Sequence, residues 1–467
     1  MTTDTTKTDW TALWRSGELV QLCFISLGIA FHAGAENMIS TIMPIIVRDI
    51  GGVQLNGWAF SIYEVGSILA GAGIGRLCTL WPVRTNMVAA ALVYAIGATI
   101  TALAPSMPIL LAARLLTGFG GGALIGLSYV AIQRYFPSAS WPQLMAILSA
   151  VWVVSAFGGP LFGGLVGTWL SWRWAFGIFA ILALLFAAAA LLVLKKEAAG
   201  ARADAPPGRF PALPLFCLAA GITAIAAAGV EPEVRQALLL VLAGLAGMAT
   251  FFLLDARSGA ARLFPAALTR PASTVGAGLW TFGLLAVSTC SFGFYGPLLL
   301  SALHGFTPVT TGLIIASESI AWSILSILVA NQPKQRETFI VRIGALMVVM
   351  GVSGFAFAVP SGSIPAIVLF ASCQGGGFGI LWPFASRRVI EAAPVAEKEI
   401  TASASSTLQR MGYAVGSATA GIIANANGFS GGFTEAAAAT AAMPLFIYFL
   451  PLAALGCLAA FRLTKTD

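Results

Sequence analysis

Charged residues are scarce in this chain. Asp, Glu, Lys and Arg make up 9% of its 467 residues, against about 25% in an average soluble domain. Four stretches contain no charged residue at all: 85–113, 135–172, 271–317 and 343–386. Each is longer than the ~20 apolar residues that a helix needs to cross a bilayer. The composition therefore predicts an all-α polytopic membrane protein and excludes a soluble enzyme.

Residues that carry catalytic chemistry are also few. The chain has two histidines and six cysteines, and the cysteines are scattered through apolar segments without a CxxC pair. It contains no P-loop, no GxSxG and no HExxH sequence. We therefore expect no enzyme, no bound metal and no other cofactor, and ATP-driven transport would need a partner chain.

Apolar segments separated by Pro, Gly and charged residues predict fourteen transmembrane helices. Their expected ranges are 20–46, 56–78, 86–104, 107–134, 142–168, 173–194, 211–230, 235–255, 274–301, 308–330, 339–359, 364–386, 401–424 and 439–462. Basic residues predict the orientation. With the N-terminus in the cytoplasm, only Arg48, Arg173 and Arg235 of the 25 Lys and Arg fall in outer loops. This follows the positive-inside rule, so we expect a bacterial-type cytoplasmic membrane, both termini cytoplasmic and no nucleic-acid partner.

Polar connections divide the helices into six, two and six. The first connection mixes charges with Ala, Gly and Pro, and the second is basic with an apolar Leu-Phe-Pro run that suits an interfacial helix. The predicted organisation is a cytoplasmic tail (1–19), a six-helix bundle (20–194), a linker (195–210), two extra helices (211–255), a second linker (256–273), a second six-helix bundle (274–462) and a tail (463–467).

Glycines recur at matching places in the two six-helix sets. The fourth helix of the first set contains Gly118 and Gly120, and the fourth helix of the second contains Gly375 and Gly379. Small residues let transmembrane backbones approach closely. Repeated halves with glycine-interrupted helices are the layout of secondary transporters, although each glycine also has a plain packing interpretation.

Several segments resemble the major facilitator superfamily. Arg114-Leu-Leu-Thr-Gly118-Phe-Gly120 resembles the RxxxGxG motif of its fourth helix, and Gly159-Pro160-Leu-Phe-Gly163-Gly164 resembles the GPxxGG motif of its drug/proton antiporters. The segment 172–176 resembles the family's WRWxF entry to helix six, and 405–416 is similar to the fourteen-helix branch. The resemblance implies two six-helix bundles with two additional central helices, and proton-driven export of drugs.

One loop departs from the family pattern. Gly75, Arg76 and Arg84 fit the motif between helices two and three, but Thr79 stands where the family has an acid and Pro82 where it has a glycine. In the family that acid helps to latch the cytoplasmic side. We therefore expect this chain to hold its cytoplasmic gate by other contacts.

Ionisable side chains inside the expected spans are candidates for the functional site, because a charge at the bilayer centre costs at least ~2.5 kcal/mol. At ~1.5 Å of helix per residue, they lie roughly 10–21 Å from the outer helix ends. That common layer predicts a shared polar cavity. They are His32, Glu36, Glu64, Arg114, Glu318 and Arg410.

Proton coupling is assigned to Glu36, with Arg114 nearby and His32 on the same helix face. The alternatives are structural: His32 would be a buried neutral imidazole, and Arg114 a fixed counter-ion for Glu36 or Glu64. Glu64 and Glu318 are assigned to the substrate cavity.

Arg410 is also assigned to the substrate cavity, with interdomain packing as its alternative. Aromatic residues within the spans could complete the pocket by stacking and cation–π contact. They are Trp152, Trp280, Tyr295, Trp322 and Trp382.

These observations predict a secondary active transporter that exports amphipathic small molecules or drugs in exchange for protons by alternating access. Two alternatives stay open: a transporter dedicated to one metabolite, anionic ones included, and a membrane sensor built on the same fold without transport. The expected partners are the substrate, protons and the lipid bilayer, and the expected state is a monomer.

Overall fold

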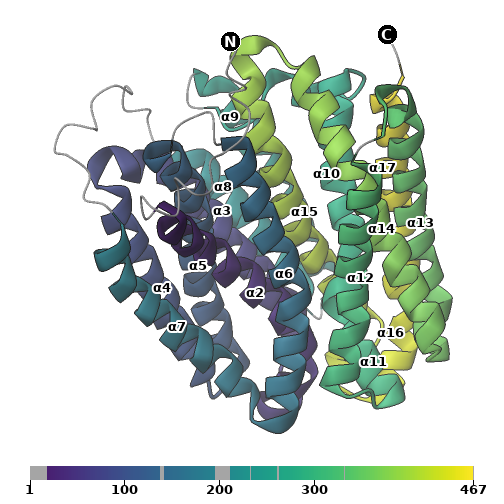
Figure 1. Ribbon diagram of the computed structural model, residues 1–467. Helices are drawn as coiled ribbons and strands as arrows, with labels where there is room; N and C mark the ends of the chain where they lie inside the picture. The colour runs from purple at the N-terminus through teal and green to yellow at the C-terminus, as the bar shows by residue number, and fades with distance from the viewer. Residues whose placement is uncertain are drawn as a thin grey trace, which may run out of the picture.

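The computed structural model describes residues 18–136, 141–194, 211–231, 233–259, 262–330 and 332–465, and within these ranges every regular element is helical (Figure 1). The predicted N-terminal tail and the 195–210 linker lie almost wholly outside the described residues. The first six long helices, which we call the N-half, are α2 (Glu18–Ile50), α3 (Asn56–Leu80), α4 (Val83–Ala102), α5 (Met107–Tyr135), α6 (Trp141–Trp169) and α7 (Trp172–Val193).

Two helices, α8 (Ala212–Ala228) and α9 (Val234–Arg257), precede the last set. This last set, the C-half, comprises α10 (Thr274–Cys290), α11 (Gly296–His304), α12 (Pro308–Val329), α13 (Glu337–Ser361), α14 (Ile364–Ala392), α15 (Lys398–Ala426), α16 (Glu435–Ile447) and α17 (Leu450–Leu463). One turn of π-helix, Ser291–Tyr295, joins α10 to α11 into one continuous helical stretch.

Every predicted span falls on one of these helices or on a joined pair. Several helices run further than predicted, as α14 does to Ala392, because their polar ends stay helical beyond the apolar stretch. Among the described helical stretches, eleven are long and apolar enough to cross a membrane. The other three are α3, α8 and α15. Polar side chains lower the hydropathy of α3 and α15, and α8 has 17 residues.

The helix pairings of the N-half recur in the C-half. In the N-half α3 packs on α5, α4 on α5 and α7, and α2 on α6. In the C-half α12 packs on α14, α13 on α14 and α17, and α10 on α15. Counted by order within each half, these are the same pairs, so the two halves are internal repeats. The pairs across the interface, α6 with α12 and α3 with α15, are also equivalent, which is the pattern of an approximate twofold axis.

The two extra helices lie beside one of these seams. α8 packs along α9 and contacts both α3 and α15, so it covers the α3–α15 seam. Asn425 fastens this corner, because its amide nitrogen donates to the carbonyl oxygens of Gln54 (2.8 Å) and Gly229 (2.7 Å). The α6–α12 seam has no such cover in the described structure.

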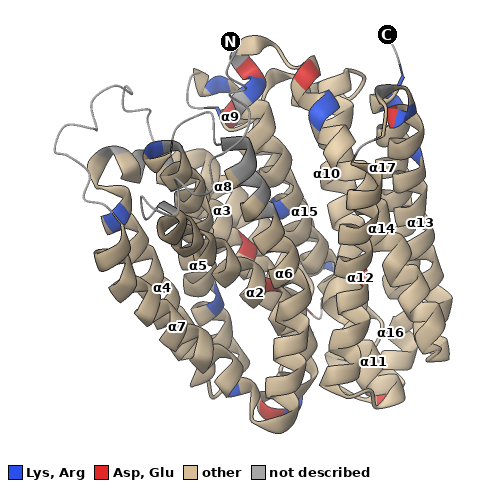
Figure 2. Ribbon diagram, in the orientation of Figure 1, with Lys and Arg blue, Asp and Glu red and all other residues tan. Residues whose placement is uncertain are grey.

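Several contacts between the halves lie toward one end of the molecule, which we call the Arg48 end. Arg48 Nη2 donates to the hydroxyl (3.0 Å) and the carbonyl (3.3 Å) of Ser301 across the interface. Deeper in, the hydroxyls of Ser61 and Ser417 are 2.7 Å apart. A Cβ on Gly164 would lie 2.7 Å from a backbone oxygen of α12. Most of the charged residues gather at the opposite end, drawn at the top of Figure 2.

Candidate functional site

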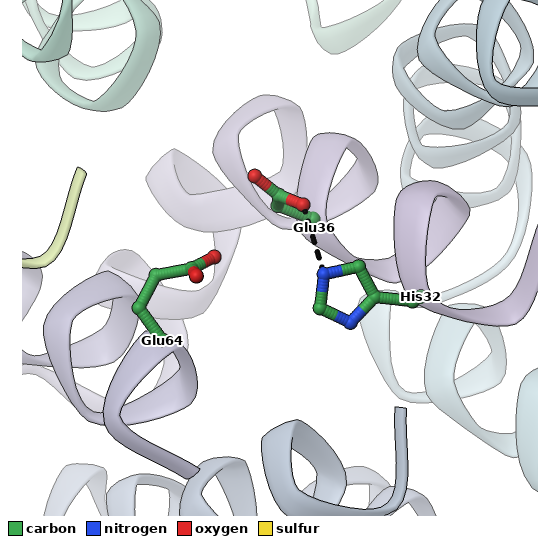
Figure 3. A group of neighbouring side chains, drawn as sticks. All are labelled: His32, Glu36 and Glu64. Carbon is green, nitrogen blue, oxygen red and sulfur yellow. Dashed lines mark ion pairs between the residues drawn. The ribbon is translucent and has the colours of Figure 1, made fainter. Parts of the chain in front are cut away.

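A buried charged cluster joins the two halves between these ends. His32 and Glu36 are one helical turn apart on α2, and Glu64 lies on the adjacent α3 (Figure 3). The three side chains point toward one another, with His32 Nε2 3.3 Å from Glu36 Oε2. His32 is fully buried, Glu64 is 2% exposed and the Glu36 side chain is 14% exposed.

Arg410 of α15 completes the cluster from the C-half. Its Nη1 lies 2.6 Å from His32 Nε2, 3.4 Å from Glu64 Oε2 and 3.3 Å from Ser67 Oγ. Arg410 and Glu64 are separated by 346 positions in the chain. The ion pair therefore depends on the relative position of the two halves, and separating them at this level would break it.

The contacts of His32 Nε2 are mutually exclusive. A ring nitrogen either carries a hydrogen and donates, or has a free lone pair and accepts. The 2.6 Å contact from the always charged Arg410 requires an accepting Nε2. Glu36 Oε2 then lacks a donor, and it has no hydrogen-bond partner among the described residues. A proton on Nε2 would reverse the arrangement, favouring Glu36 and repelling Arg410.

Tyr63 fixes the other side of the imidazole. Its hydroxyl lies 3.0 Å from His32 Nδ1 and 3.3 Å from the His32 carbonyl oxygen. If His32 Nδ1 carries the proton, it donates to the Tyr63 oxygen, and the Tyr63 hydrogen reaches the carbonyl. This matches the tautomer that accepts from Arg410 at Nε2.

Arg114 lies beneath Tyr63 rather than against a carboxylate. The guanidinium carbon is 4.0 Å from the Tyr63 ring centroid, and Nε donates to the Ala59 carbonyl at 3.3 Å. Arg114 is fully buried, and its Nη1 and Nη2 have no hydrogen-bond partner in the described part of the chain. The structure therefore gives Glu64 a different ion-pair partner, Arg410, from the one considered on sequence grounds.

Glu318 is not part of this cluster in the described contacts. It lies on α12 and accepts a hydrogen bond of 2.9 Å from Gln374 Nε2 of α14, within the C-half. The similar depth of Glu318 and Glu64 predicted a shared cavity, but depth does not specify the direction in which a helix face points.

Trp152 is the predicted aromatic residue that contacts the cluster. Its ring lies 6.1 Å from the His32 ring and 5.9 Å from the Arg410 guanidinium carbon. The other four pack elsewhere: Trp280 Nε1 donates to the Leu268 carbonyl, Tyr295 stacks on Phe429, Trp322 stacks on Phe378, and Trp382 packs on Phe282.

The predicted motif glycines lie at close backbone contacts. A Cβ on Gly118 would lie 2.1 Å from the Tyr63 carbonyl oxygen, and one on Gly120 would lie 2.5 Å from the Tyr94 nitrogen. At Gly159 and Gly163 the nearest backbone oxygens of α2 would be 2.9 Å away. These contacts hold α3 and α2 against α5 and α6, which places the clustered side chains.

The remaining motif residues are less informative. The Pro160 carbonyl faces Gly312 of α12 across the seam, and Arg84 lies in the first turn of α4. Gly75 and Arg76 belong to α3, and the surroundings of Gly75 and of the Arg76 side chain are outside the described part of the structure.

Sequence reasoning missed Tyr63, Ser67 and Gln374. Tyr63 directly precedes Glu64, and Ser67 follows Glu64 by about one helical turn. Their closeness to Glu64 in the sequence could have indicated that they belong to the site. Gln374 precedes the Gly375 run on α14, but nothing local links it to Glu318.

His32, Glu36 and Glu64 also form a set of possible cation ligands, with their ligand atoms all within 4.8 Å of one another. In this structure, however, the cation among them is the guanidinium of Arg410.

The comparisons with known proteins agree with this fold. Residues 25–358 match the Major Facilitator Superfamily. The chain is 30% identical over 455 residues to the "Probable multidrug-efflux transporter Rv1634" of Mycobacterium tuberculosis, covering 94% of this chain and 93% of that protein. It is 26% identical over 302 residues to the "Multidrug efflux pump SdrM" of Staphylococcus aureus, covering 64% and 66%.

A solved structure gives the same fold. The crystal structure of the nucleoside transporter NupG covers 97% of this chain, and this chain covers all of that one, with a TM-score of 0.65 at 14% identity. The family match and the similarity to a multidrug-efflux transporter over nearly the whole chain support a multi-pass membrane transporter of small molecules. The chain belongs to the major facilitator superfamily.

Proposed function

We propose that the protein exports amphipathic small molecules, cationic drugs among them, in exchange for protons. The observation that carries this proposal is the buried ion pair between Glu64 of the N-half and Arg410 of the C-half. In alternating access the halves rock against each other around a central site. A central charge pair made across the interface must therefore change during the cycle.

Charge balance explains why a proton would be involved. In the cluster and its immediate surroundings, Glu36 and Glu64 are balanced by Arg114 and Arg410. If the halves part, Arg410 leaves and the N-half retains two carboxylates and one arginine. An unpaired buried charge is strongly unfavourable. One proton, or one cationic substrate, restores neutrality, so the two would compete for the same carboxylates.

We infer that Glu36 exchanges the proton with His32 as its relay, and that Glu64 holds the cationic substrate. Support for Glu36 comes from its partial exposure and from its contact with His32 Nε2. Support for Glu64 comes from its ion pair with a residue of the other half. Trp152 supplies the aromatic face that organic cations favour.

The proposal includes a membrane arrangement. We propose fourteen crossings, organised as six, two and six, in a bacterial cytoplasmic membrane with both termini in the cytoplasm and a monomeric transporter. The Arg48 end would then face outward. Its close contacts between halves support an inward-facing state, in which the outer gate is closed by Arg48–Ser301 and Ser61–Ser417.

Transport assays with purified protein in liposomes test the function. An imposed pH gradient should drive accumulation of a cationic dye such as ethidium, and collapse of the gradient by an ionophore should stop it. No gradient-driven movement of ethidium or of other cationic and neutral amphipathic compounds would contradict proton-coupled drug export.

A further inference from the structure

Arg410 occupies the groups that a cationic substrate would use. Its Nη1 is within 3.4 Å of Glu64 Oε2, and its guanidinium carbon lies 5.9 Å from the Trp152 ring. A carboxylate combined with an aromatic face is a general recognition site for organic cations. The C-half therefore places a cation of its own in the cation site of the N-half.

Burial shows that the carboxylate is not accessible in this placement. Glu64 is 2% exposed, whereas the Arg410 side chain paired with it is 19% exposed. A cation from solution therefore has to displace neighbouring groups to reach Glu64. Arg114 cannot take over the pairing with Glu64 without moving, because its guanidinium lies on the Tyr63 ring and its Nε bonds the Ala59 carbonyl.

The histidine adds a second form of competition. Arg410 donates to His32 Nε2 at 2.6 Å, so this nitrogen must be unprotonated while Arg410 is in place. The other ionisable groups that interact with Arg410 are Glu36, Tyr63 and Tyr129. His32 differs from these three groups, because its Nε2 has a single lone pair. That lone pair can accept from Arg410 or bind a proton, but not both.

We propose that Arg410 is a tethered stand-in for a cationic substrate. It fills the Glu64–His32 site when substrate and proton are both absent, and a cationic substrate or a proton on His32 Nε2 displaces it. While Arg410 is in place, the Glu64 carboxylate at the interface therefore keeps a cationic partner. This inference rests on the proposed function and adds to it how the Glu64 site is occupied when no substrate is bound.

Equilibrium binding of matched probes to purified protein tests the proposal. Tetraphenylphosphonium is the cationic probe and triphenylphosphine oxide is the neutral one. Removing the competitor by Arg410→Gln should tighten tetraphenylphosphonium binding about tenfold, equivalent to about 1.4 kcal/mol, and leave triphenylphosphine oxide unchanged. The gain should disappear in the double variant with Glu64→Gln, because the carboxylate freed by Arg410 is then absent.

A matched control separates this effect from a general loss of positive charge. Arg342 bonds Thr464 Oγ1 (2.9 Å) and lies over Phe461, outside the cluster. Arg342→Gln should bind both probes as the wild type does. If Arg410→Gln does not yield monodisperse protein, Arg410→Lys provides the test. It retains the charge but loses the planar fork, so it should bind tetraphenylphosphonium more tightly than wild type and triphenylphosphine oxide equally well; no gain for tetraphenylphosphonium would contradict the proposal.

Three results would overturn the proposal: unchanged or weaker tetraphenylphosphonium binding by folded Arg410→Gln, an equal gain for the neutral probe, or a gain that survives Glu64→Gln. Because binding is measured in detergent without a gradient, its outcome is independent of gradient-driven flux. Wild-type protein that binds as predicted but shows no pH-driven transport would contradict the proposed function alone.

Discussion

Substitution of Gly118 by alanine should disturb both stability and transport. Its added Cβ would lie 2.1 Å from the Tyr63 carbonyl oxygen and 2.9 Å from the Tyr63 Cα. The first contact is about 1.3 Å short of ordinary van der Waals separation, and backbone atoms cannot rotate away. Overpacking of this kind typically costs about 1–3 kcal/mol. Because the displaced residue contacts His32 and precedes Glu64, α3 must move at the cluster itself.

Thermal unfolding in detergent and ethidium flux in liposomes measure the two effects. We expect Gly118→Ala to unfold a few degrees below wild type and to transport more slowly. Gly71→Ala is the matched control, since it lies on α3 and its Cβ would have no atom within 4 Å. Wild-type stability and flux in folded Gly118→Ala would refute the inferred role of close α3–α5 packing.

Three further predictions concern the interface between the halves, the Asn425 contacts and the Glu318–Gln374 hydrogen bond. Cysteines at both Ser61 and Ser417 should cross-link on mild oxidation and stop transport reversibly, which gel mobility and flux under reductant would check; transport that continues after full cross-linking contradicts the closing role. Asn425→Ala leaves two backbone carbonyls without donors and should destabilise the protein by about 1–3 kcal/mol, seen as a lower unfolding temperature, with no change counting against the fastening role. Glu318→Gln should keep pH-driven flux but alter the relative rates for different cations, because its carboxylate contacts Gln374 rather than Arg410; loss of coupling there would move the proton site.

Helix positions could be predicted because they depend on local composition. Long charge-free stretches and breaks at Pro and Gly located every described long helix to within a few residues. The π-helical turn Ser291–Tyr295 could not be predicted in this way, since it changes neither hydropathy nor charge. The number of membrane crossings is also difficult to read from hydropathy, because α3 and α15 carry the polar groups of the site.

The sequence indicated candidate ionisable residues for the site, but not which of them contact one another. Helix depth selected His32, Glu36 and Glu64, and the structure places these three side chains close together. Depth also selected Glu318, which contacts Gln374 instead. Depth along a helix does not specify the direction of a side chain, because tertiary packing sets the rotation of each helix about its own axis. The partnership of Arg410 with His32, 378 positions away, depends on how the halves meet. No local sequence pattern indicates a contact between residues so far apart in the chain.

Proton coupling through Glu36 is tested most directly by comparing gradient-driven and gradient-free transport in one variant. Glu36→Gln preserves size but cannot exchange a proton. We predict that liposomes containing this variant lose pH-driven ethidium accumulation yet retain ethidium exchange without a gradient, while Glu233→Gln, at a carboxylate outside the cluster, behaves as wild type. Accumulation by Glu36→Gln at the wild-type rate under the same gradient would contradict the account.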